Sequence, residues 1–88
     1  MTKKISVIFA DDYELMHYSI NLILSMEQNI HLVAEAYNGE QLIRLVELHT
    51  PDVVLIDVKM PVMDGIEATR IISKKYPTVG IIALSIFI

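Results

Sequence analysis

The sequence predicts an α/β domain whose strands form a parallel sheet. Four apolar, strand-like runs occupy residues 5–10, 30–36, 53–57 and 80–88, and segments with helical periodicity separate them. This alternation implies a parallel sheet with right-handed helical crossovers. The chain has 88 residues, enough for one small domain, so we expect a single domain over residues 1–88.

The first predicted strand is Ile5–Ala10, an apolar run that stops at Asp11 and Asp12. Over residues 12–26, apolar side chains then recur at helical spacing: Leu15, Met16, Ile20, Ile23 and Leu24. We expect these side chains to form the buried face of the first helix. Asp12 should cap this helix or enter its first turn, where a carboxylate interacts favourably with free backbone N–H groups.

The second predicted strand is Ile30–Ala36, and a helix ending near His49 follows it. Asn38 begins this helix, and Gln41 stands three residues later, which is the spacing of a capping box. The apolar side chains of this helix share one face: Leu42, Leu45 and Val46. This face is therefore expected to pack against the sheet.

The third predicted strand, Val53–Asp57, is a continuous apolar run of the kind found in strands buried on both faces. A third helix is predicted over residues 64–75, with four buried positions: Ile66, Ala68, Ile71 and Ile72. Residues 80–88 form the fourth predicted strand. From residue 81 onward its only polar side chain is Ser85.

Composition argues against several classes of function. The formal net charge is −4, so we expect no direct nucleic-acid binding by this chain. The sequence has no cysteine, which excludes disulfides and thiolate metal sites. It has no leader-like segment and no apolar run of the ~18 residues that a membrane span requires. We therefore expect no membrane association and a cytoplasmic location.

Carboxylates stand at the ends of two predicted strands. Asp11 and Asp12 follow the first strand, and Asp57 ends the third, so the three converge if these strands are neighbours. Converging carboxylates favour a bound cation, and an oxygen-rich cluster suits Mg²⁺. A carboxylate beside such a cation can accept a phosphoryl group, and Ser85 would add a hydroxyl at the same edge. The alternative is structural, with the acids serving only in turns and helix caps.

Three motifs resemble the receiver domain of bacterial two-component response regulators. They are Asp11-Asp12 after the first strand, the run DVKMPVMDG at residues 57–65, and Ala83-Leu84-Ser85. The match continues in register through the whole chain, and its spacing is most similar to receivers that precede a LuxR-type helix-turn-helix domain. The resemblance implies a flavodoxin-like, doubly wound parallel sheet with the strand order 2-1-3-4.

The resemblance also implies roles for individual residues. Asp57 would accept a phosphoryl group from a phosphohistidine on a sensor histidine kinase or phosphotransfer protein. Mg²⁺ would be held by Asp12, Asp57 and the backbone carbonyl of Lys59, and by Asp11 through a water molecule. Ser85 would be the switch hydroxyl that follows the phosphoryl group. Such a domain is a phosphoacceptor, not an enzyme, apart from self-catalysed phosphotransfer and dephosphorylation.

The sequence departs from the family pattern after its fourth strand. The last helix, strand and helix of the family are absent, and so is the lysine that ends the fifth strand. The fourth strand thus becomes an apolar sheet edge, which is a template for pairing with another chain. We therefore expect a homo-oligomer, formed through the exposed fourth strand and the uncovered face of the sheet.

The missing lysine leaves two further questions open. Lys59 lies two residues after Asp57, so its ammonium group could partly replace that lysine at the phosphoryl site, although a solvated loop lysine is the simpler interpretation. The chain could instead be a receiver that is not phosphorylated and serves as an oligomeric interaction module. A phosphatase of the haloacid dehalogenase type is disfavoured, since Asp11-Asp12-Tyr13 lacks the D-x-D motif.

Overall fold

The computed structural model describes residues 3–84 of the chain. Its elements, in chain order, are β1 (Ile5–Ala10), α1 (Glu14–Ser25), β2 (Ile30–Ala36), α2 (Gly39–His49), β3 (Val53–Asp57), α3 (Gly65–Lys75) and β4 (Gly80–Leu84). All strands pair in parallel, in the order β2-β1-β3-β4. The predicted fold class and the strand order 2-1-3-4 are therefore confirmed. Within the described residues, no helix is both long and apolar enough to cross a membrane.

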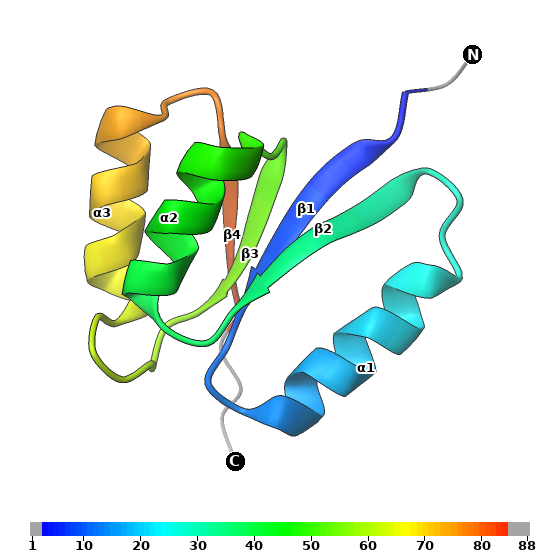
Figure 1. Cartoon of the computed structure of the whole chain (residues 1–88), viewed down its shortest axis with the longest axis horizontal. Helices are drawn as coiled ribbons and strands as arrows, with labels where there is room; N and C mark the ends of the chain where they lie inside the picture. Colours follow the sequence, from blue (N-terminus) through cyan, green and yellow to red (C-terminus); the bar gives the residue numbers. More distant parts are fainter. Residues whose placement is uncertain (1–2, 85–88) are drawn as a thin grey trace.

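The main core lies between the sheet and the helices α2 and α3, which cover one of its faces (Figure 1). Because side chains alternate along a strand, every second residue of β1 and β3 points into this core. The sheet and the two helices contribute fully buried side chains: Ile8, Ala10, Val54, Ile56, Leu42, Val46, Ala68 and Ile72. Ala10 and Ile56 belong to this core, so the carboxyl ends of β1 and β3 are held in place by packing.

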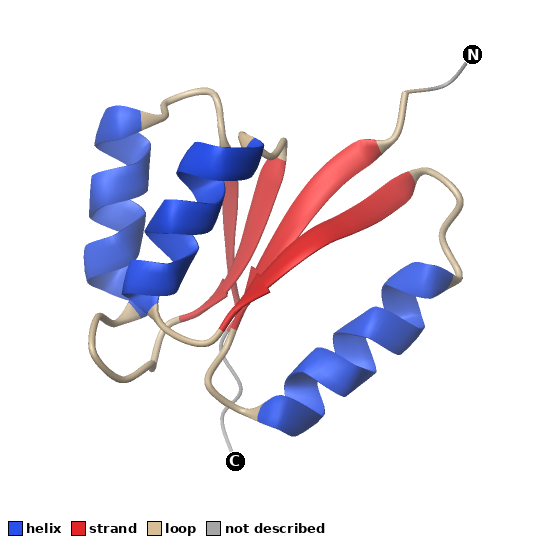
Figure 2. Cartoon of the chain, in the orientation of Figure 1, coloured by secondary structure: helices blue, strands red, loops and turns tan. Residues whose placement is uncertain are grey.

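The opposite face of the sheet is covered by α1, which packs against β2 (Figure 2). The only buried side chain of α1 is His17, whereas Leu15 and Ile23 are exposed, so the prediction that both are buried is wrong. Among residues 3–84, α1 is the one helix on this face, so no described helix covers the β4 end. Ile82 of β4 is accordingly 51% exposed.

The predicted N-terminal starts of the helices agree with the structure for α2 and α3 but not for α1. Asn38 caps α2 by accepting a hydrogen bond from the Gln41 N–H at 2.9 Å, and Asp64 caps α3 by accepting from the Glu67 N–H at 2.9 Å. The expectation that Asp12 caps or enters α1 is wrong. The cap is Tyr13, which makes no side-chain capping bond.

Two further expectations differ from the structure. Ile66, predicted to be buried in the third helix, is 65% exposed, because the buried face of α3 is formed by Gly65, Ala68 and Ile72. The fourth strand is described from Gly80 to Leu84. Ser85 and the rest of the predicted strand, residues 86–88, lie outside the described residues.

Candidate functional site

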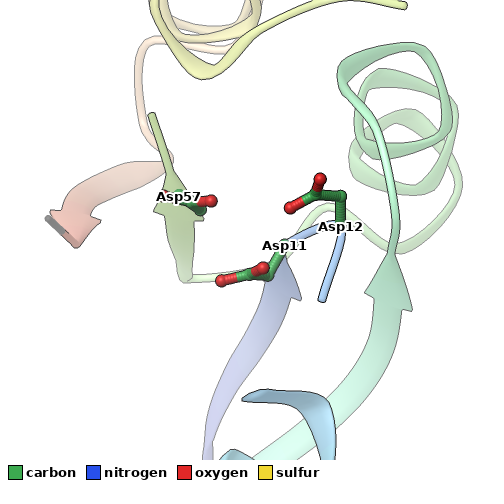
Figure 3. Close-up of side chains that lie close together, drawn as sticks. All are labelled: Asp11, Asp12 and Asp57. Atoms are coloured by element: carbon green, nitrogen blue, oxygen red, sulfur yellow. The ribbon is translucent and has the colours of Figure 1, made fainter. Parts of the chain in front are cut away.

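Three carboxylates meet at the carboxyl edge of the sheet (Figure 3). β1 and β3 are neighbours, and Ala10 pairs with Ile56, so the residues that follow each of them lie side by side. One carboxylate oxygen from each of Asp11, Asp12 and Asp57 lies within 4.8 Å of the others. The structure therefore brings together the three acids that the sequence singled out.

Asp11 is the most enclosed member of this cluster, with only 6% of its surface exposed. Its Oδ1 accepts a hydrogen bond from the Tyr13 N–H at 2.8 Å, and its own N–H donates to the Ala36 carbonyl at 3.1 Å. Burial raises the pKa of the Asp11 carboxyl group, and the nearby charges of Asp57 and Asp12 raise it further, while the bond from Tyr13 opposes the shift. The cluster thus favours a compensating positive charge.

Asp57 is half-buried at the end of β3, and Asp12 is exposed. Both acids open into a cleft of about 390 Å³, which has seven lining residues: Asp11, Asp12, Tyr13, Met16, Asp57, Lys59 and Leu84. A second hollow, bordered by Asp12 and Lys59, continues along the β3–α3 loop. The carboxylates are therefore accessible to a small ion and to a phosphoryl group.

Lys59 is an exposed residue of the β3–α3 loop that borders both hollows. It makes no salt bridge with an acid of the described chain. The resemblance implies that its backbone carbonyl is a metal ligand, and this role remains a prediction. Ser85, the predicted switch hydroxyl, cannot be placed, because it lies outside residues 3–84.

Close backbone contacts hold the β3–α3 loop against the end of β3. The Gly65 N–H donates to the Val58 carbonyl at 2.8 Å, and a Cβ at Gly65 would lie 2.4 Å from the Asp57 carbonyl oxygen. The Gly39 N–H donates to the Met63 carbonyl at 2.9 Å, which ties the same loop to α2. Two glycines therefore permit the approach that positions the backbone around Asp57.

His17 is a neighbour of this site that sequence reasoning did not identify. The histidines were too scattered along the chain to suggest a site, yet the His17 ring lies 2.7 Å from both the Asp11 carbonyl oxygen and Glu35 Oε1. One signal was available. His17 adjoins Met16 on α1 and is one helical turn before Ile20 and Asn21, so it stands at the boundary of the apolar face.

The donor set fits a hard divalent cation. Carboxylate oxygens are the ligands that Mg²⁺ prefers, and it is commonly bound through one or two carboxylates while retaining several waters. Asp11, Asp12 and Asp57 supply such oxygens beside an open cleft. Bound there, Mg²⁺ would offset the charge both of the acids and of an incoming phosphoryl group.

The whole chain from Val7 onward matches one protein family, the response regulator receiver domain, over residues 7–88. The chain belongs to this family. Receiver domains are signalling modules that generally bind Mg²⁺ at an acidic pocket, and the Asp11–Asp12–Asp57 cluster lies at the corresponding edge of this sheet.

Known receivers support the same assignment. The chain is 41% identical over 83 residues to the transcriptional regulatory protein DegU of Brevibacillus brevis, which covers 94% of this chain. It superimposes with a TM-score of 0.87 and 28% identity on the receiver domain of the putative response regulator NarL from Mycobacterium tuberculosis, covering 92% of this chain and 65% of that one.

A third neighbour was solved with a phosphoryl mimic. It is the isolated receiver domain of RcsB from Salmonella enterica in the presence of BeF3⁻, with a TM-score of 0.85, 26% identity, and coverage of 92% of this chain and 61% of that one. The chain spans only 35% to 40% of the length of the first curated relatives that it matches. The likeness therefore concerns the receiver part of those regulators.

Proposed function

We propose that this domain accepts a phosphoryl group on Asp57 from a phosphohistidine of a sensor histidine kinase or phosphotransfer protein. The observation that carries the proposal is the convergence of Asp11, Asp12 and Asp57 oxygens within 4.8 Å at the carboxyl edge of a receiver fold. Asp57 is the candidate acceptor because it ends the central strand β3 and opens into the cleft.

In the proposed reaction, an Asp57 carboxylate oxygen attacks phosphorus while the phosphorus–nitrogen bond of the donor breaks. The electron pair of that bond returns to the imidazole nitrogen, so an acyl phosphate and a histidine result. Asp12, Asp57 and the Lys59 backbone carbonyl would hold Mg²⁺, and Asp11 would act through a water molecule. Asp11 is buried beside these ligands and lines the same cleft.

The remaining roles follow from the same proposal. Ser85 would bind the phosphoryl group after transfer, and the Lys59 ammonium group would partly neutralise it. Hydrolysis of the acyl phosphate would be self-catalysed. The domain would act in the cytoplasm, as the receiver of a longer regulator of transcription, since its relative DegU is a transcriptional regulatory protein.

The test is incubation of the purified chain with acetyl phosphate and Mg²⁺, followed by intact-mass measurement. We expect the parent to gain the mass of one phosphoryl group and Asp57→Asn to gain none. Asp52→Asn is the matched control, because Asp52 lies at the opposite edge of the sheet beside Ser6. If the parent gains no mass, the phosphoacceptor proposal fails and the alternative, an interaction module that is not phosphorylated, replaces it.

We also propose that the 88-residue chain self-associates through β4 and the open sheet face. Among the described strands, β4 pairs only with β3, so its other edge presents unpaired backbone groups, and Ile82 is 51% exposed. At roughly 25 cal/mol per Å², covering a few hundred Å² of apolar surface would contribute several kcal/mol.

Light scattering at micromolar concentration tests this association. We expect the parent to be dimeric or larger, and Ile82→Lys to shift it toward the monomer. Leu48→Lys is the matched control, because Leu48 is exposed on α2, on the other side of the sheet. A monodisperse monomer for the parent would contradict the proposal.

A further inference from the structure

His17 of α1 is a buried side chain whose polar partners are Glu35 of β2 and the backbone of Asp11. Only 2% of its surface is exposed, and both of its ring nitrogens have close partners. Nδ1 lies 2.7 Å from Glu35 Oε1 of β2, and Nε2 lies 2.7 Å from the backbone carbonyl oxygen of Asp11. We call this group, completed by Asn21, the His17 clasp.

Both partners of the His17 ring are acceptors, one a carboxylate and the other a carbonyl. A carbonyl oxygen can only accept, so Nε2 must carry the hydrogen of its contact with Asp11. Nδ1 faces Glu35 Oε1, the second partner. Asn21 Nδ2 also donates to Glu35 Oε1 at 2.9 Å and to the His17 carbonyl at 2.9 Å, so the carboxylate is itself fixed.

Aromatic neighbours fix the orientation of the same ring. Tyr37 stacks on His17 with centroids 4.0 Å apart and an interplanar angle of 25°. Phe9 packs edge-on at 4.9 Å. A ring with two directed polar contacts and two aromatic contacts has little freedom to rotate, so the Nε2 atom stays aimed at the Asp11 carbonyl.

The clasp and the sheet together hold the Asp11 backbone from both sides. The Asp11 N–H donates to the Ala36 carbonyl of β2 at 3.1 Å, while its carbonyl oxygen is bound by His17. Its Oδ1 is occupied by the Tyr13 N–H. These contacts leave the second carboxylate oxygen of Asp11 available to face a cation.

We infer that His17 is a positioning residue, which fixes the Asp11 carboxylate for cation binding through its contact with the Asp11 backbone. The inference rests on the proposed function, because it takes Asp11, Asp12 and Asp57 as the cation site. Groups that orient metal ligands commonly change metal affinity by about 10- to 100-fold when they are removed. Because His17 acts on the backbone of a ligand that would bind through water, we expect a change near the lower end, about tenfold.

The test compares Mg²⁺ affinity, measured by calorimetric titration, in the parent and in His17→Phe. Phenylalanine keeps an aromatic ring between Tyr37 and Phe9 but removes both nitrogens. We expect about tenfold weaker Mg²⁺ binding, no change in the matched control His31→Phe, which alters an exposed residue of β2, and recovery in His17→Arg, whose guanidinium can donate to both partners.

Stability is measured in parallel, because a purely structural role would lower the free energy of unfolding and leave the affinity of the folded protein unchanged. If His17→Phe does not fold, Glu35→Gln serves instead: it removes the charge that faces the ring and should weaken Mg²⁺ binding less severely. Unchanged Mg²⁺ affinity in the folded variant would overturn the positioning role of His17 and would not affect the proposed function. If the parent binds no Mg²⁺, the proposed function falls together with it.

Discussion

The Asp11 carboxyl group has a raised pKa because it is buried and because Asp57 and Asp12 lie beside it. A carboxyl group whose pKa is higher in the folded than in the unfolded chain destabilises the fold as the pH rises through that interval. The cost is complete once the pH exceeds the pKa of Asp11 in the folded chain. A cation that binds only the folded state would offset it.

Replacing Asp11 by Asn should therefore stabilise the cation-free protein. The amide oxygen can still accept the Tyr13 N–H, but the like-charge repulsion and the cost of burying a charge are removed. We expect Asp11→Asn to melt several degrees higher than the parent in EDTA at neutral pH. Added Mg²⁺ should raise the melting temperature of the parent more than that of the variant, which keeps Asp12 and Asp57. A lower melting temperature for the variant in EDTA would contradict this explanation.

Asp52 presents the opposite case at the other edge of the sheet. Its pKa is lowered because the Ser6 N–H and hydroxyl donate to Oδ2 at 2.8 and 3.1 Å. A carboxyl group with a lowered pKa stabilises the fold at pH values above its ordinary pKa. This stabilisation is lost as the pH falls through the pKa that the group has in the folded chain.

We accordingly expect Asp52→Asn to lower the free energy of unfolding at neutral pH. The difference from the parent should shrink in acid, below the ordinary pKa of a carboxyl group. Urea denaturation of the parent and the variant, at neutral pH and in acid, measures this difference. A difference that stays constant across this range would show that the Asp52 charge contributes nothing.

The loop between β3 and α3 packs closely against the backbone of the site. A Cβ at Gly65 would lie 2.4 Å from the Asp57 carbonyl oxygen, which is backbone and cannot move without shifting the end of β3. We expect Gly65→Ala to cost about 1–3 kcal/mol of stability, and to slow phosphorylation of the protein that remains folded.

The control is Gly80→Ala, because a Cβ at Gly80 would meet its nearest atom, the Asp52 carbonyl oxygen, at an ordinary 3.5 Å. This variant should remain within about 0.5 kcal/mol of the parent. If chemical denaturation gave the same free energy of unfolding for Gly65→Ala and Gly80→Ala, the proposed close contact between the loop and the end of β3 would be contradicted.

The end of α2 carries a different kind of strain. Thr50 caps this helix in the left-handed region, with φ 41° and ψ 63°, a conformation that disfavours a β-branched residue. Thr50→Gly should stabilise the protein by about 1 kcal/mol. Thr50→Ala, which retains a Cβ, should gain much less, and guanidinium denaturation of the two variants separates them. No gain with glycine would contradict the backbone explanation.

Periodicity located the elements well but could not tell whether the apolar face of α1 is covered. The strand Val53–Asp57, the cap at Asn38 and a helix beginning at residue 64 were predicted because their signals are local. The buried face of α1 was not, since Leu15 and Ile23 have helical spacing whether or not a neighbour covers them. Coverage depends on how many helices share that side of the sheet, which is a property of the tertiary structure.

At the scale of the whole molecule, the strand order brings acids that are far apart in the sequence together in one site. β1 lies beside β3, so Asp11 and Asp57, 46 positions apart in the numbering, converge at one edge. Strand alternation and the acidic motif were enough to predict this meeting. They could not predict the His17 clasp, because a lone histidine in a helix carries no sign of the strand residue and the loop carbonyl that it contacts.

The central claim is that Asp57 is the phosphoacceptor of a Mg²⁺-dependent receiver. Its most direct test is to locate the modified residue by tandem mass spectrometry after incubation with acetyl phosphate, with Mg²⁺ or with EDTA. The account predicts a phosphoryl group on Asp57 in Mg²⁺ and none in EDTA. Modification of another carboxylate such as Asp12, or equal modification of Asp57 in EDTA, would contradict it.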